Sequence, residues 1–189
     1  MNRSDRTSEP NWAPIPTQIV VIGTQIRRGG DGAQIRGRGA AGGGSVATVG
    51  LSVVSDRTLV LFKPDAVERG LVGTILARFE AKGLRLVTLD LRMLDDDTLS
   101  RHYAEHVGKP FYSDLVAFMS RGPVVALVLE GPENTWEVVR TLMGTTNPRN
   151  AAPGTIRGDL GIELTENLVH GSDSLESAAR EVSIFFPDL

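Results

Sequence analysis

The sequence predicts an α+β fold, a ferredoxin-like split βαβ sandwich with helices packed on a four-stranded antiparallel sheet. The first observation is the order of apolar patterns after Asp56, which runs β-α-β, then two short helices, then β-α-β-α. The second is a pair of uninterrupted apolar runs, 58–62 and 124–129, of the length that buried strands have. From this order we expect the helices to cover one face of the sheet.

The first three elements occupy residues 58–94. The run 58–62 is the first strand. Next comes an amphipathic helix that Gly83 ends, and its apolar residues follow the i, i+3, i+4, i+7 spacing: Val72, Ile75, Leu76 and Phe79. Residues 84–94 alternate in polarity and predict a strand that is buried on one side. The residues expected on the buried side are Val87, Leu89, Leu91 and Met93.

The remaining elements follow in the same way. Two short helices are expected at 97–106 and 111–119, separated by Gly108 and Pro110. The sequence then predicts a central strand at 124–129, a helix at 135–143, a polar loop at 144–159, a last strand at 163–169 and a final helix. This final helix contains Leu175, Ala178, Ala179 and Val182, with Asp173 and Glu176 spaced as a capping box.

Residues 1–55 have a different composition from the rest. They hold 10 of the 21 glycines and six arginines against three acids, so residues 56–189 carry a net charge of −6 in a chain of −3. Glycine is costly to order and buries nothing, so we expect a disordered extension. The sequence leaves open a basic tail for acidic partners or a translation start near Val53 or Val54. The segment 37–42 fits G-x-G-x-x-G, but it lacks the flanking strand and helix of a dinucleotide site.

The overall composition excludes several classes of protein. The 189 residues are 41% hydrophobic and 23% charged, as in ordinary globular proteins. There is no cysteine, which excludes disulfide scaffolds, thiolate zinc sites and cysteine nucleophiles. The longest aliphatic run, 124–129, is too short to cross a bilayer, and no secretory signal pattern follows Met1. We therefore expect a cytoplasmic protein with no membrane partner, and we expect no nucleic-acid partner.

One motif points to a metalloprotease. His102, Glu105 and His106 fit H-x-x-E-H, in which two histidines on one helix face bind zinc and the glutamate acts as the base. No clear third protein ligand follows in the sequence. We therefore interpret this segment as a partly exposed amphipathic helix. Stoichiometric zinc that survives dialysis would support the protease instead.

A second motif, His170-Gly171-Ser172-Asp173, lies at the end of a predicted strand and before a helix. A helix N-terminus offers backbone N–H donors and a positive dipole end, which favour phosphate. Neutral imidazole has a free lone pair and can act as a nucleophile. Three cations and a hydroxyl elsewhere in the chain are of the type that holds a polyphosphate: Lys63, Arg140, Arg157 and Thr146.

These residues carry a resemblance to a known family. The chain resembles nucleoside diphosphate kinases across residues 56–189, and its N-x-x-H-G-S-D motif is nearly diagnostic. The matching segments, in order and spacing, are 63–65, Tyr103, 109–111, 120–125, 146–148, 153–159 and 167–173. The resemblance implies transfer of the γ-phosphate of ATP or another nucleoside triphosphate to a nucleoside diphosphate, by a ping-pong mechanism through a phosphohistidine. It also implies Mg²⁺ held by the nucleotide phosphates rather than by the protein, and a homo-oligomer, with a hexamer favoured over a tetramer.

The resemblance also assigns residue roles. His170 is implied to be the nucleophile, and Glu181 orients its imidazole. The residues implied to hold the phosphates are Lys63, Arg140, Thr146 and Arg157, while Asn167 and Lys63 contact the sugar. Phe111 would stack on the base, and Tyr103 would support the site from behind.

Two positions depart from the family pattern. Ala66 replaces the glycine that usually follows Lys-Pro-Asp, and Glu166 precedes Asn167 where many members have a basic or apolar residue. Neither departure removes a catalytic group. A catalytically silent interaction module on the same fold remains the alternative.

Overall fold

The computed structural model describes residues 55–189. The predicted disordered extension at 1–55 and the glycine motif at 37–42 lie outside this range, except for Ser55. Four strands form one antiparallel sheet in the order β2-β3-β1-β4. The strands are β1 (Ser55–Phe62), β2 (Arg85–Arg92), β3 (Val124–Pro132) and β4 (Val169–Gly171). The predicted fold class is therefore confirmed.

Seven α-helices and two short 3₁₀ helices connect the strands of the described segment. Their bounds are α1 (Pro64–Glu68), α2 (Val72–Ala81), α3 (Asp96–His102), η1 (Ala104–His106), α4 (Tyr112–Ser120), α5 (Thr135–Met143), η2 (Pro148–Asn150), α6 (Ile156–Leu160) and α7 (Leu175–Phe185). The helix predicted at 97–106 thus divides into α3 and η1, and the loop predicted at 144–159 contains η2 and α6. No helix between residues 55 and 189 has the length and apolar character needed to span a bilayer.

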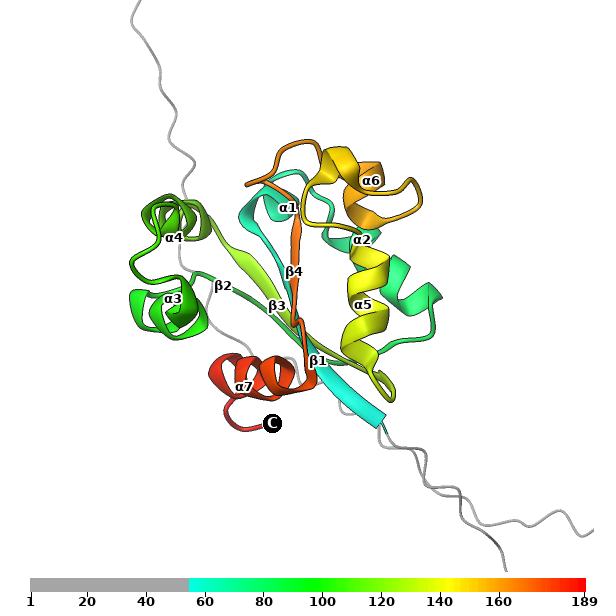
Figure 1. The fold of residues 1–189 in the computed structure, drawn as a ribbon. Helices are drawn as coiled ribbons and strands as arrows, with labels where there is room; N and C mark the ends of the chain where they lie inside the picture. Colours follow the sequence, from blue (N-terminus) through cyan, green and yellow to red (C-terminus); the bar gives the residue numbers. More distant parts are fainter. Residues whose placement is uncertain (1–54) are drawn as a thin grey trace, which may run out of the picture. The chain divides into compact units, whose positions relative to one another are not determined.

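Helices cover both faces of the sheet, so the expectation of one covered face is wrong. Along β1, Val60 and Phe62 belong to a core cluster with α2 and α5, whereas Leu59 and Leu61 belong to a second cluster with α3, α4 and α7. Figure 1 shows these two groups of helices on opposite sides of the strands. A strand buried on both faces is a continuous apolar run without alternation, which is the pattern of residues 58–62.

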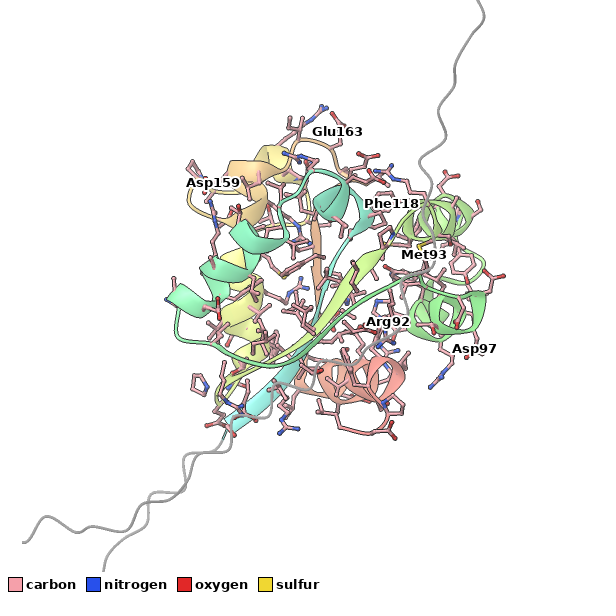
Figure 2. The ribbon with its side chains drawn as sticks, turned by 180° about the vertical axis from the view of Figure 1, so that it is seen from behind. Arg92, Met93, Asp97, Phe118, Asp159 and Glu163 are labelled. Carbon is pink, nitrogen blue, oxygen red and sulfur yellow. The ribbon has the colours of Figure 1, made fainter. Side chains whose placement is uncertain are left out.

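Strand β2 forms one edge of the sheet, and its predicted buried side is largely exposed. The relative exposure is 38% for Leu89, 51% for Leu91 and 57% for Met93, which follows the strand. A register shift between Leu86 and Thr88 interrupts the pairing with β3. Figure 2 shows Met93 at the end of β2, beside α3 and α4. The apolar alternation therefore marks a face that no helix between residues 55 and 189 fully covers.

The last strand is shorter and later than predicted. It covers Val169–Gly171 rather than 163–169, and it pairs only with β1. The turn before it contains Leu168, which is fully buried at a φ of 70°. A non-glycine residue at such a φ is uncommon and interrupts an extended strand. Helix α7 is capped by the Ser174 side chain, which accepts the Ser177 N–H at 3.0 Å, so the predicted capping box is wrong.

Candidate active site

His170 is the central residue of β4, where it pairs with Leu61 of the buried strand β1. Its side chain keeps 26% of its surface exposed. The strand fixes the backbone of His170, and Ser174 begins α7 four residues later. The sequence predicted correctly that this histidine comes shortly before a helix, but it lies within the strand rather than after it.

Glu181, from α7, lies directly behind the His170 imidazole. His170 Nε2 is 3.1 Å from Glu181 Oε2, and the Ser172 hydroxyl donates to the same oxygen at 2.7 Å. Burial favours the neutral acid, but the hydrogen bond and charge of His170 outweigh it and lower the Glu181 pKa to about 2. An ionised carboxylate only accepts hydrogen bonds, so Nε2 carries the imidazole proton. His170 Nδ1 is then left with its lone pair.

His102, at the end of α3, is a third member of this group, and its place here was not predicted. Its ring packs edge-to-face on the His170 ring, with centroids 4.7 Å apart. Its Nδ1 lies 3.7 Å from Glu181 Oε1, too far for a hydrogen bond. Burial, followed by the charge of His170, lowers the His102 pKa to about 3, so the ring is neutral. The sequence grouped His102 with His106, which shares its helical spacing, rather than with residues of α7.

A row of rings extends from His170 toward the surface. Tyr103 lies edge-on to His102 at 4.5 Å and stacks on His106 at 6.0 Å, and His106 meets Phe111 at 5.5 Å. Tyr103 is buried and Phe111 is 48% exposed. In the described segment, the group of possible metal ligands that contains His102 includes His170 and Glu181 and not His106.

Lys63, just before α1, is buried beside the turn that precedes β4. Its Nζ donates to Asn167 Oδ1 at 2.8 Å and lies 5.8 Å from the centre of the Phe118 ring. Figure 2 shows Phe118 between α4 and the sheet. Burial, followed by the charge of Arg157, lowers the Lys63 pKa to about 8. Lys63 is therefore a cation at neutral pH that titrates more easily than an exposed lysine.

Arg157, on α6, is held by backbone carbonyls. It donates to Asn167 O at 3.3 Å, Gly144 O at 2.8 Å and Val169 O at 2.7 Å. Burial, followed by the charge of Arg140, lowers the Arg157 pKa to about 10, so it remains charged at neutral pH. The guanidinium therefore lies between α6, the end of α5 and the strand of His170.

The remaining predicted binding residues approach the same segment, 167–171. Arg140 donates to Gly171 O at 3.4 Å, and Asn167 Nδ2 donates to Thr146 O at 3.1 Å. The side chains of Arg140 and Thr146 are otherwise exposed. Lys63, Arg140, Thr146 and Arg157 thus surround the strand of His170, whereas Phe111 lies at the outer end of the row of rings.

The two departures from the family pattern fit their surroundings. Ala66 is fully buried inside α1 and does not have a positive φ, so a glycine is not required there. Glu166 accepts a hydrogen bond from Arg121, whose guanidinium also binds Glu68. This ion-pair group joins α1, the end of α4 and the turn before Asn167.

Comparisons with known proteins identify the family of this chain. The nucleoside diphosphate kinase family model matches residues 56–189. A nucleoside diphosphate kinase of Streptomyces avermitilis is 62% identical over 135 residues, covering 71% of this chain and 98% of that protein. One from a Nocardioides species is 60% identical over 136 residues, covering 72% and 100%. The solved structure of a halophilic nucleoside diphosphate kinase from Halobacterium salinarum in complex with CDP has a TM-score of 0.69 and 47% identity, covering 71% of this chain and 90% of that one.

Proposed function

Because this chain belongs to the nucleoside diphosphate kinase family, we propose that His170 carries the phosphoryl group in its reaction. The activity of the family is phosphoryl transfer from a nucleoside triphosphate, such as ATP, to a nucleoside diphosphate. The observation that supports His170 is its contact with an ionised Glu181, at 3.1 Å from Nε2. That contact leaves Nδ1 as the nucleophilic nitrogen.

The proposed step needs no general base. The Nδ1 lone pair attacks the γ-phosphorus, the Nδ1–P bond forms, and the bond to the bridging oxygen breaks with release of the nucleoside diphosphate. The ring becomes positively charged because Nε2 keeps its proton, and the Glu181 carboxylate compensates that charge. The second nucleoside diphosphate reverses the same step, so the kinetics are ping-pong.

The cations near β4 are proposed to hold the phosphates. Lys63, Arg140 and Arg157 supply positive charge, and Thr146 supplies a hydroxyl; such groups neutralise the charge on the equatorial oxygens. Asn167 and Lys63 are proposed to bind the sugar. Phe111, whose ring is half exposed, is proposed to stack on the base, and Tyr103 supports the ring of His102.

Family members require a divalent cation in general, and for this chain we propose Mg²⁺. Magnesium prefers oxygen ligands and commonly binds substrate phosphates. The proposed phosphate-binding side chains are cationic or neutral, so the nucleotide would supply the ligands. When bound, the ion neutralises phosphate charge.

The family is typically oligomeric, and we propose a homo-oligomer, with a hexamer favoured over a tetramer. The free edge of β2 supports contact between copies. Leu89, Leu91 and Met93 are exposed there, and an edge strand offers unpaired backbone groups to another chain. We further propose a cytoplasmic location, no membrane or nucleic-acid partner, and residues 56–189 as the nucleoside diphosphate kinase domain.

Phosphoryl labelling tests the assignment of His170. Incubation with γ-labelled ATP should give an acid-labile label in the wild-type protein and none in His170→Ala. His106→Ala is the matched control, because it removes a histidine that has no proposed role in the transfer and should keep the label. Label retained in His170→Ala would disprove the assignment. The catalytically silent alternative predicts that neither the wild type nor the control becomes labelled.

A further inference from the structure

Three side chains from separate elements converge behind β4. His102 comes from α3, His170 from β4 and Glu181 from α7. Each offers one ligand atom, and these atoms lie within 4.8 Å of one another. Two imidazoles and a carboxylate are a donor set that binds Zn²⁺ in proteins.

His102 does not have the hydrogen bonds that a structural histidine needs. Neither of its ring nitrogens has a partner among residues 55–189, although its side chain is only 1% exposed. Buried polar groups are nearly always paired, and an unpaired one calls for an explanation. Its Nδ1 is close to Glu181, so this unpaired group belongs to the same cluster.

We propose that His102, His170 and Glu181 bind one Zn²⁺ ion per chain, and that the bound ion blocks phosphoryl transfer. Two neutral imidazoles favour zinc over magnesium, which prefers oxygen ligands. The binding site rests on the geometry of this chain, while the block of transfer also rests on the proposed role of His170.

The three side chains lie near the spacing of a zinc site and would have to move closer together when an ion binds. Tetrahedral zinc with bonds of about 2.0–2.1 Å separates its ligand atoms by roughly 3.3 Å. Glu181 Oε2 lies 3.1 Å from His170 Nε2, Glu181 Oε1 lies 3.7 Å from His102 Nδ1, and the three possible ligand atoms all lie within 4.8 Å of one another. One separation is shorter and the other longer than the ideal, so the carboxylate oxygens already face both imidazoles.

The surrounding charges permit a cation at this position. Glu181 contributes a carboxylate whose side chain is only 6% exposed. Arg180, the only arginine on α7, pairs with Glu105 at 3.2 Å, although its charge also acts on His102. The Ser172 hydroxyl donates to Glu181 Oε2, whose carboxylate retains further lone pairs for a metal.

Zinc would switch off the nucleophile through its tautomer. Binding to Nε2 requires that nitrogen to give up its proton, and in the neutral ring the proton then resides on Nδ1. Nδ1 thereby loses the lone pair that attacks phosphorus. Removal of the metal restores the Nε2–H donor to Glu181, so the block is reversible.

The binding arm of the test uses Zn²⁺ alone. The chain has three histidines and no cysteine, which leaves few competing ligands. Titration against a zinc-binding chromophore should give one ion per chain, and affinity should fall at least tenfold in His102→Gln and in Glu181→Gln. His106→Gln is the matched control and should bind as the wild type does. Absence of saturable binding, or a loss in His106→Gln that His102→Gln does not show, would overturn the site.

Two further measurements keep the test independent of how the variants fold. Wild-type crystals soaked in Zn²⁺ should show an anomalous peak between the three residues at the zinc absorption edge, and a peak elsewhere would overturn the site. Labelling by γ-labelled ATP should stop at buffered free Zn²⁺ and return after chelation. If zinc binds the three residues while His170-dependent labelling continues, the proposed block is wrong. If His170→Ala is itself labelled, the proposed role of His170 is wrong. The zinc site is then tested by the Zn²⁺ titration and the anomalous peak alone.

Discussion

The Lys63 ammonium donates a 2.8 Å hydrogen bond to Asn167 Oδ1, which joins residues 104 positions apart into one buried pair. The backbone strengthens the connection. Lys63 N donates to Leu168 O at 2.8 Å, and Leu168 N donates to Asp65 Oδ2 at 3.0 Å. The start of α1 and the turn before β4 therefore form one unit, which fixes the cation beside the strand of His170.

The titration of Lys63 predicts a loss of activity at alkaline pH. Burial and the neighbouring Arg157 lower its pKa to about 8, so the ammonium loses its charge as the pH rises through this value. The kcat/KM of the free enzyme for nucleotides should then fall, approaching about tenfold per pH unit well above the pKa. A pH profile of kcat/KM measures this.

Lys63→Arg is the control for that profile. Its guanidinium stays charged throughout the range, so kcat/KM should be lower at neutral pH but should not show the decline near this pH. An identical alkaline decline in both proteins would assign the titration to another group.

The buried His102 predicts an acid-sensitive fold. The unfolded histidine has the ordinary pKa of 6.5 and the folded one about 3, so below 6.5 the unfolded state binds more protons. The stabilisation is fully present above 6.5 and is lost as the pH falls toward 3. By linkage, the free energy of unfolding should drop by about 2 kcal/mol from about pH 7.5 to about pH 5.

Urea unfolding at the two pH values measures this drop. Protein concentration must be the same throughout, because assembly shifts apparent stability. His102→Gln should lose most of the drop and His106→Gln should retain it. An unchanged drop in His102→Gln would show that other groups cause it.

Phe111 predicts broad base specificity. Strong discrimination needs hydrogen bonds to the base, whereas stacking accepts every base. ADP, GDP, CDP and UDP should all be substrates, with kcat/KM values within roughly two orders of magnitude and purines leading. Phe111→Ala should weaken the binding of all four by about 1–3 kcal/mol and reduce the purine advantage.

Kinetics with the four diphosphates on both proteins test this, and Val107→Ala, at a neighbouring exposed position, is the control. A preference above about a thousandfold for one base would require a base-specific contact.

The exposed face of β2 predicts that a charge placed on it will weaken the oligomer and lower its thermal stability. A charge at Leu91, which is 51% exposed, would be buried without a partner if copies meet there, so Leu91→Glu should yield smaller species and a lower Tm. Sedimentation velocity and thermal unfolding measure both effects. Ile162→Glu, at a position 67% exposed in the turn after α6, should leave both unchanged. If Leu91→Glu assembles as the wild type does, the interface between copies does not include this face of β2.

The sequence predicted the elements that local patterns determine. Helix α5 has the predicted bounds, and the buried strands β1 and β3 contain the predicted apolar runs. The assignment of 163–169 as a strand failed because the positive φ of Leu168 and the Asp65 hydrogen bond depend on α1, far away in the chain. The alternating apolar residues of β2 were predicted to be buried. They are exposed because residue spacing within a strand does not show which part of the strand a helix packs against.

In the candidate site, too, some residues were predicted from local patterns and one was missed. His170 was predicted from its motif and its place before a helix, and its contact with Glu181 is present in the structure. His102 was missed as a member because its nearest polar groups come from β4 and α7, while its sequence neighbours suggested a pair with His106. The signal available in the sequence was its position beside Tyr103, which the resemblance had placed near the site.

Arg157 takes the place of a missing sheet neighbour. Strand β4 is an edge strand, and the outward carbonyl of Val169 is satisfied by the guanidinium instead of another strand. Three of the five N–H groups of the arginine are used on backbone carbonyls, which leaves two for a ligand. A lysine has only three donors, all on one atom, and could not span the same carbonyls. The backbone carbonyls and a bound ligand therefore share the five N–H donors of Arg157. Lysine carries the same charge but cannot replace arginine at position 157.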